Sequence, residues 1–143
     1  MLKGFEDAFV DVQASVISLC LELLSNSGRT AEKIYVYLYQ NNDIDYIDAF
    51  FEQEGKLYTT ISDFFDCGVE DIEKLIDICN AYDSKCPHEL KLIYNVVTKS
   101  FDSEYNYENI IDIGEKSVFE LAKDWFDDCD KTLLNDRRFL VCN

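Results

Sequence analysis

The alternation of aliphatic and aromatic residues between Lys33 and Tyr39 constrains the fold more than any other stretch of this chain. Side chains at alternate positions of an extended backbone point to opposite sides. The aliphatic row is Ile34, Val36 and Leu38, and the tyrosine row is Tyr35, Tyr37 and Tyr39. Because β-branched and aromatic residues favour pleated geometry, the stretch predicts a strand with two different faces.

The rest of the chain switches between helical and extended hydrophobic periods. Apolar residues at steps of three and four predict helices over 5–24 and 66–83 and a third helix that begins near Glu115. Steps of two predict further strands over 44–52, 57–62, 89–96 and 100–108. Turn residues at 40–43 and 53–56 join the first three strands into a meander. The tail 136–143 is expected to form a short strand or a docked segment.

This order of elements predicts a single α+β domain over residues 1–143. We expect an antiparallel sheet of about five strands, in the order α-β-β-β-α-β-β-α, with the helices packed on one face. A chain of this length is the usual size of one domain and leaves no room for a second core.

Acidic residues outnumber basic ones by 29 to 13, which gives a formal net charge of -16. Apolar residues make up 48% of the chain and aromatic residues 14%, so the composition is that of a folded domain and not of an acidic disordered tail. Nucleic acid and anionic membranes need Lys and Arg that this chain does not have to spare, which excludes both as direct partners. The expected partner is a basic protein, and the sequence leaves the oligomeric state open.

Six cysteines and a single histidine, His88, are the residues that suggest a metal site or disulfides. No two cysteines form a CxxC pair, which is the spacing typical of zinc sites. We therefore expect reduced structural cysteines, no bound metal and a reducing cytoplasmic location. The N-terminal residues also lack the basic leader and unbroken apolar run of a signal peptide.

Catalytic motifs are not found in the sequence. Nucleophilic catalysis usually needs a histidine base, and His88 beside Pro87 is interpreted as a surface or lightly packed imidazole. The glycines are isolated, so no phosphate-binding loop is predicted, and we expect neither an enzyme nor a cofactor. The segment 43–48 resembles the start of a calcium loop, but Ile47 occupies a ligand position, which favours a solvated charged face.

Acidic side chains on three predicted elements are the candidate partner-binding residues. They lie on the second helix, the last strand and the third helix, and they are Glu70, Asp71, Glu73, Asp77, Asp102, Glu104, Glu108, Asp124, Asp127 and Asp128. A standard interface covers roughly 800 Å² per partner, so only one of these groups is expected to form it. The sequence does not decide which one.

The tyrosine row is the remaining candidate for partner binding. If one face of the sheet is open, Tyr35, Tyr37 and Tyr39 suit it, because a tyrosine ring buries apolar area while its hydroxyl stays in water. If both faces are covered, the row belongs to the core. Both interpretations remain open at this point.

Two segments carry a resemblance to a known group of proteins. They are the tyrosine-rich strand 33–39 and the late hairpin formed by Glu89-Leu90-Lys91-Leu92-Ile93-Tyr94 and Phe101-Asp102-Ser103-Glu104-Tyr105-Asn106-Tyr107. In these segments and in element order the chain resembles bacterial immunity proteins of polymorphic-toxin or contact-dependent growth inhibition systems, particularly the YezG-like antitoxins. The resemblance implies a cytoplasmic protein that neutralises a cognate toxin, often a nuclease.

Elementary electrostatics agrees with that implication. A nuclease holds a polyanion in a basic cleft, and an acidic domain meets such a cleft with complementary potential. The alternatives are an acidic adaptor or chaperone-like subunit that binds a basic partner without inhibiting it, and an enzyme whose site is assembled from dispersed carboxylates.

Overall fold

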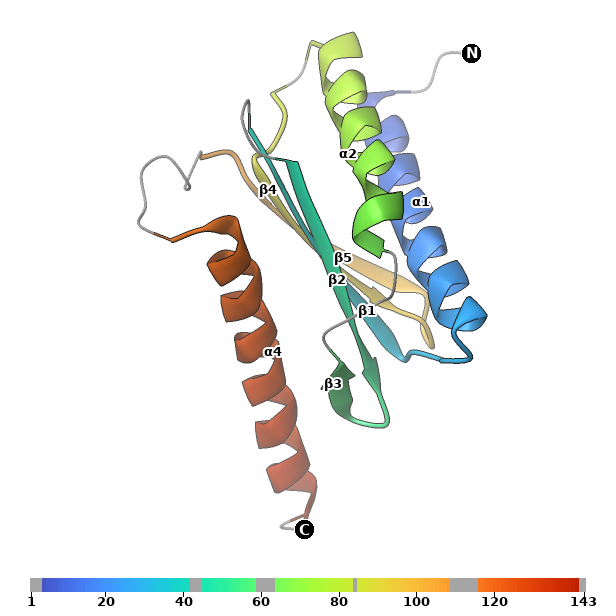
Figure 1. Cartoon of the computed structure of the whole chain (residues 1–143), viewed down its shortest axis with the longest axis vertical. Coiled ribbons are helices and arrows are strands. Elements are labelled where there is room, and N and C mark those ends of the chain that lie inside the picture. The colour runs from blue at the N-terminus through green and yellow to red at the C-terminus, as the bar shows by residue number, and fades with distance from the viewer. Residues whose placement is uncertain (1–3, 42–44, 59–63, 84, 109–115, 142–143) are drawn as a thin grey trace.

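The computed structural model describes residues 4–41, 45–58, 64–83, 85–108 and 116–141. A five-stranded antiparallel sheet has the order β3-β2-β1-β4-β5. Its strands are β1 (Lys33–Gln40), β2 (Asp45–Gln53), β3 (Lys56–Tyr58), β4 (Glu89–Asn95) and β5 (Ser100–Asn106). The helices are α1 (Phe5–Asn26), α2 (Phe64–Ala81) and α4 (Val118–Val141), as Figure 1 shows. The expected fold class, strand number and element order are confirmed.

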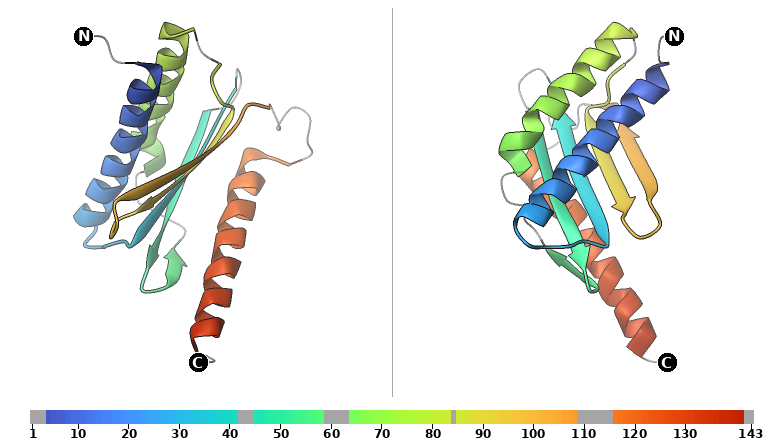
Figure 2. Two further views of the ribbon diagram at one scale, coloured as in Figure 1. Left: turned by 180° about the vertical axis from the view of Figure 1, so that it is seen from behind. Right: turned by 90° about the vertical axis from the view of Figure 1, so that its right-hand side faces the viewer.

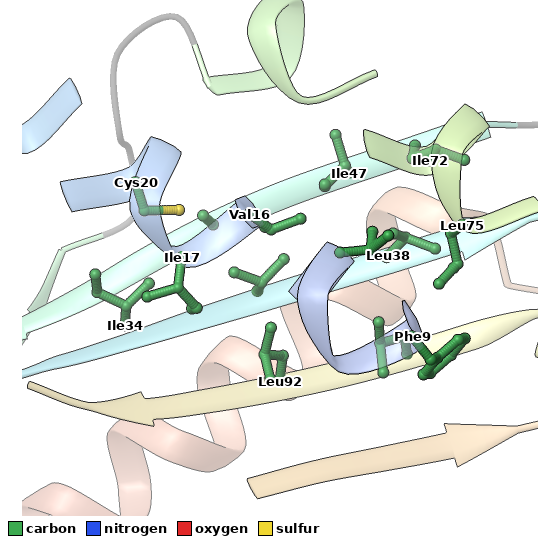
Figure 3. Packing of buried hydrophobic residues seen from close by; sticks show 14 of the residues in the cluster. Phe9, Val16, Ile17, Cys20, Ile34, Leu38, Ile47, Ile72, Leu75 and Leu92 are labelled. Atoms are coloured by element: carbon green, nitrogen blue, oxygen red, sulfur yellow. The ribbon is translucent and has the colours of Figure 1, made fainter. Parts of the chain in front are cut away.

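The aliphatic row of β1 forms the centre of the main core. Ile34, Val36 and Leu38 are buried against residues of α1 and α2, which lie side by side over this face of the sheet (Figures 2 and 3). The inward stripes of the two helices are Phe9, Val12, Val16, Ile17, Cys20, Leu24, Ile72, Leu75 and Cys79. Burial of this apolar area is the main stabilising contribution to the fold.

Helix α1 is also, over Glu6–Asn26, long and apolar enough to span a membrane by length and composition alone. The core helix of a folded domain passes the same test. In this structure the apolar stripe of α1 is packed on the sheet and on α2, while Glu6, Asp7, Asp11 and Glu22 are exposed.

The tyrosine row of β1 lies in a second core on the opposite face of the sheet. Tyr37 and Tyr39 pack with Val118 and Ala122 of α4, and Figure 2 shows α4 on the far side of the sheet from α1 and α2. The expectation that all helices pack on one face is therefore wrong for α4. The physical reason is that a continuous aromatic row is itself a large apolar surface, and the apolar stripe of α4 removes it from water.

The turn and the helix ends follow the local sequence. Glu54 and Gly55 have φ angles of 54° and 76°, both positive as a two-residue type I′ hairpin requires, which confirms the turn predicted at 53–56.

Helix α4 continues to Val141, so the alternative of a short strand at 136–141 is wrong. No proline or glycine interrupts residues 118–141, which explains why the helix continues.

Some predicted elements fall partly outside the described residues. Strand β3 is observed at Lys56–Tyr58, whereas residues 59–62 of the predicted strand lie outside them. Ile44, Glu115 and the last two residues of the tail, 142–143, also lie outside the described residues.

Candidate protein-binding surface

The tyrosine row is buried and is not a docking surface. Tyr35, Tyr37 and Tyr39 are 5%, 0% and 0% exposed. Trp125 of α4 lies over them, with its ring centroid 6.0 Å from that of Tyr35 and 6.2 Å from that of Tyr37. The prediction that these tyrosines bind a partner from an open face is wrong, and the alternative that both faces are covered is confirmed.

Each of three tyrosines on this face has a carboxylate partner. Tyr37 donates a 2.5 Å hydrogen bond to Glu89 of β4, and Tyr46 donates one of 3.2 Å to Asp48. Tyr35 is hydrogen-bonded to Glu52, and burial and this carboxylate raise the pKa of Tyr35. These partners explain why Tyr35 and Tyr37 are tyrosine and not phenylalanine, because the buried carboxylates need donors. The carboxylates paired here belong to the core and not to an interface.

Asp48 gives this face a testable pH dependence. Burial raises the pKa of the Asp48 carboxyl above its usual value of 3.8, although the Ala49 N–H and the Tyr46 hydroxyl oppose the shift. A folded-state pKa above the unfolded one means that ionisation costs stability at neutral pH, and the cost disappears as the pH falls through the folded pKa toward 3.8.

We therefore expect Asp48→Asn to be more stable than the wild type at pH 7. Its amide oxygen still accepts the Ala49 N–H bond, which is 2.8 Å long in the wild type. Urea unfolding at pH 7 and near pH 4 measures the difference, which should shrink at the lower pH. Asp45→Asn, at an exposed position of the same strand, is the control. If the Asp48→Asn variant is no more stable than the wild type at pH 7, burial of the Asp48 carboxylate does not cost stability, and the prediction is wrong.

The acidic residues of α2 form an exposed face that points away from the sheet. Glu70, Glu73 and Asp77 are exposed because Ile72 and Leu75 turn the opposite side of the helix into the core. Asp71 lies in α2, but its side chain is outside the described part of the structure. This group lies on the α1–α2 side of the molecule.

The acidic residues of the last strand lie on the other side. Asp102 and Glu104 are exposed on β5, opposite Ile93 and Lys91 of β4, and Glu108 is exposed beyond the end of the strand. The side chains of Asp102 and Glu104 therefore point to the face of the sheet that α4 covers. The predicted alternation is confirmed for these two residues, but the strand ends at Asn106, so the prediction that it continues to Glu108 is wrong.

The opposite face of β5 is attached to α1 through one buried glutamine. Gln13, only 1% exposed, donates to the Tyr105 hydroxyl at 2.9 Å and accepts a 2.7 Å bond from the Ser103 hydroxyl. The ring of Tyr105 packs edge-on against Phe9 with 5.4 Å between centroids. These contacts fix the position of the edge strand. Gln13 is not among the residues predicted to be functional, although a polar side chain within the apolar stripe of α1 is itself a signal.

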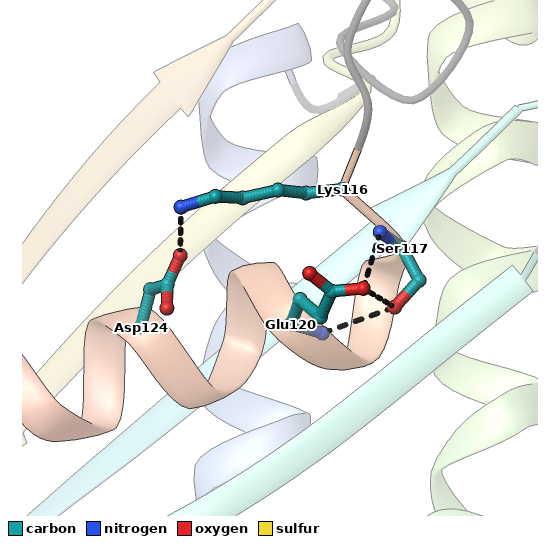
Figure 4. A network of polar contacts seen from close by, with 4 residues as sticks. All are labelled: Lys116, Ser117, Glu120 and Asp124. Atoms are coloured by element: carbon teal, nitrogen blue, oxygen red, sulfur yellow. Dashed lines mark hydrogen bonds and ion pairs between the residues drawn. The ribbon is translucent and has the colours of Figure 1, made fainter.

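The acidic residues of α4 are mostly half-exposed. Asp124 forms a 2.6 Å ion pair with Lys116, and this bond raises the pKa of the Lys116 amine (Figure 4). Ser117 and Glu120 form a capping box, in which the Ser117 hydroxyl accepts the Glu120 N–H and Glu120 accepts the Ser117 N–H. Asp127 is half-buried and Asp128 is exposed.

The fold thus brings two of the three predicted groups to one side of the sheet. Lys91 lies between them, since it pairs with Glu104 and its amine is 6.0 Å from the Trp125 ring. The α2 group lies on the opposite side. No interface that fits the standard size would combine it with the other two.

His88 and the described cysteines have structural contacts. The Nδ1 atom of His88 is 2.8 Å from the Gln40 carbonyl oxygen, and the imidazole stacks on Tyr39. Cys79, Cys86 and Cys129 are free thiols, and Cys20 is buried in the main core. The Cys79 and Cys86 thiols are hydrogen-bonded, and burial is the main cause that raises the pKa of Cys86 to about 12. The side chain of Cys67 and all of Cys142 lie outside the described residues.

Within the described ranges, no group of three or more His, Cys, Asp or Glu side chains is arranged to hold a metal ion. Asp45 and Asp48, from the segment that resembles a calcium loop, are three positions apart on β2 and point to opposite faces. Among known proteins, no family model matches the chain, and no curated protein matches it in sequence.

Proposed function

We propose that this chain is an immunity protein that binds and neutralises a basic bacterial toxin, a nuclease domain, in the cytoplasm. The observation that carries the proposal is the exposure of carboxylates on both sides of the molecule, as at Glu73 and Asp77 on α2 and Asp102 and Glu104 on β5. A net charge of -16 adds long-range attraction for a basic protein. A basic nuclease cleft covered by such a surface no longer reaches its substrate.

The β5 and α4 groups favour one side of the molecule for this contact. Together they place Asp102, Glu104 and Asp128 on one side of the sheet beside the aromatic anchor Trp125, which is partly exposed. Interfaces gain most of their energy from a few partly apolar anchors, while the surrounding charges set association rate and specificity.

The test is inhibition of a purified basic nuclease toxin encoded beside this chain. We expect stoichiometric addition of the full chain to abolish nuclease activity, and binding to weaken when salt is raised from about 0.05 to about 0.5 M. A nuclease that stays fully active when saturated with the chain would contradict inhibition and favour the adaptor function. Equal affinity at both salt concentrations would show that the net charge of the chain is not central to recognition of the toxin.

A pair of charge-matched variants locates the contact. Asp102→Lys with Glu104→Lys changes the β5 row, and Glu73→Lys with Asp77→Lys makes the same change in net charge on the α2 face. If the β5 side binds the toxin, the first variant loses at least tenfold more affinity than the second. The opposite order would place the interface on α2.

A further inference from the structure

Strand β5 is an edge of the sheet with an open outer side. Figure 2 shows β5 at the margin next to β4, and within the described residues no strand pairs with its other side. It is seven residues long, whereas β3 at the opposite edge has three described residues. An unpaired edge presents backbone donors and acceptors that can pair with another chain.

The hydrogen-bond pattern of β4 shows which of its residues bond to each neighbour. In an antiparallel ladder, alternate residues direct both backbone groups to one neighbouring strand and the intervening residues direct theirs to the other. At one end of the β1–β4 pair, Val96 N donates to Glu32 O at 2.8 Å. At the other end His88, just before β4 begins, accepts the Gln40 N–H at 2.8 Å through its carbonyl, while its own N–H donates to Asn106 O at 2.9 Å. The even-numbered residues of β4 therefore bond to β1, and the odd-numbered ones bond to β5.

The open groups of β5 follow from this pattern. Lys91 and Ile93 bond to Glu104 and Asp102, which lie directly across from them. The intervening residues of β5 direct their N–H and C=O groups to the open side, and they are Phe101, Ser103 and Tyr105. Ser103 is the central one.

The side chains of β5 make pairing with a second copy unfavourable. If two β5 strands paired antiparallel about Ser103, Asp102 of each copy would lie opposite Glu104 of the other. Like charges directly opposite each other are destabilising. The acidic side chains of Asp102 and Glu104 instead attract lysine or arginine at the positions of an incoming strand that lie opposite them.

From the open edge and its acidic row, we infer that β5 binds an extended basic segment of a partner protein by adding it to the sheet as a sixth strand. The basic side chains of the segment lie over Asp102 and Glu104. The intervening apolar side chains lie on the other face beside Tyr105, which is 39% exposed. This inference rests on the proposed function for its class of partner, a basic protein, and adds the mode of recognition.

The probe is a capped heptapeptide of alternating lysine and valine, added to the full chain labelled with ¹⁵N. The valines lie opposite Phe101, Ser103 and Tyr105, so the backbone groups of the valines form the new ladder. The matched control peptide carries N-methylvaline at the same positions and keeps the charge while losing those donors. We expect the first peptide to slow amide hydrogen exchange at Phe101, Ser103 and Tyr105, and the control to bind at least tenfold more weakly.

Variants of the chain test the same contact from the other side. Ser103→Pro removes an outward N–H that the β4 ladder does not use, and proline is tolerated at such positions of edge strands. Ser103→Ala removes only the hydroxyl bond to Gln13 and serves as the control. The proline variant should bind the lysine–valine peptide at least tenfold more weakly than the alanine variant. If the N-methylated peptide binds the wild type within threefold of the unmodified one, the inference is wrong whatever the variants do.

The failures of the two proposals are distinguishable. A Ser103→Pro chain that inhibits the toxin as well as the wild type overturns strand addition and leaves inhibition standing. A chain that binds the peptide at β5 but does not inhibit a basic toxin keeps the edge site and contradicts the immunity function.

Discussion

Replacing Trp125 with alanine should lower the free energy of unfolding by about 3 kcal/mol, the lower end of the range for removing a large aromatic side chain, because the ring is only partly buried. The indole packs edge-on against Phe50 with 5.1 Å between centroids and covers Tyr35 and Tyr37. The variant leaves a gap over the centre of the tyrosine row. Trp125 is the single tryptophan of the chain, so unfolding in urea is followed by far-ultraviolet circular dichroism.

Phe119 provides the control on the same helix. Its ring is 66% exposed and touches Tyr46 with 5.0 Å between centroids. Phe119→Ala should cost less than about 1 kcal/mol, since it removes little buried area. Equal losses for the two variants would show that the ring contacts of Trp125 with Tyr35, Tyr37 and Phe50 stabilise the fold no more than the exposed contact of Phe119 does.

Replacing Tyr37 with phenylalanine should cost about 2 kcal/mol, the usual effect of removing a buried hydrogen bond to a charged group. The variant keeps the ring in the core and leaves the Glu89 carboxyl, 8% exposed, without the Tyr37 donor. Urea unfolding of Tyr37→Phe, Glu89→Gln and the double variant gives the coupling between the two side chains.

Tyr107→Phe removes the same atom from a side chain that is 43% exposed and should cost less than about 1 kcal/mol. A Tyr37→Phe variant as stable as the wild type, or a coupling energy near zero, would show that the hydroxyl of Tyr37 does not stabilise the buried carboxylate.

The secondary structure was predictable because it depends on local patterns. The two-residue period of β1, the turn at Glu54-Gly55 and the apolar stripe of α2 each define an element within a few residues of its observed bounds. The antiparallel hairpins follow from the short turns between neighbouring strands.

The second core was not predictable in the same way. Alternation shows that Tyr35 and Ile34 point to opposite faces, but it does not show which helix covers each face, because that depends on packing between distant segments. A row of buried tyrosines and a row of exposed tyrosines both repeat every two residues, so the period does not distinguish a buried row from an exposed one. The deciding contacts come from Trp125 and Val118, which follow β1 by more than half the length of the chain.

The candidate surface was predictable residue by residue but not as a surface. The outward positions of Asp102 and Glu104 follow from the alternation of β5. Their place on the same side as α4, and the open edge beside them, depend on the pairing of β4 with β1, between residues at least fifty positions apart in the sequence. The sequence alone does not specify that strand order.

The position of α4 has a consequence for synthesis of the protein. The ribosome completes all five strands before it makes α4, so a nascent sheet that has already paired presents its aromatic face to solvent until the helix emerges. During that interval the uncovered aromatic face is an apolar surface prone to aggregation. A stop in translation before Val118 would release a product with that face uncovered.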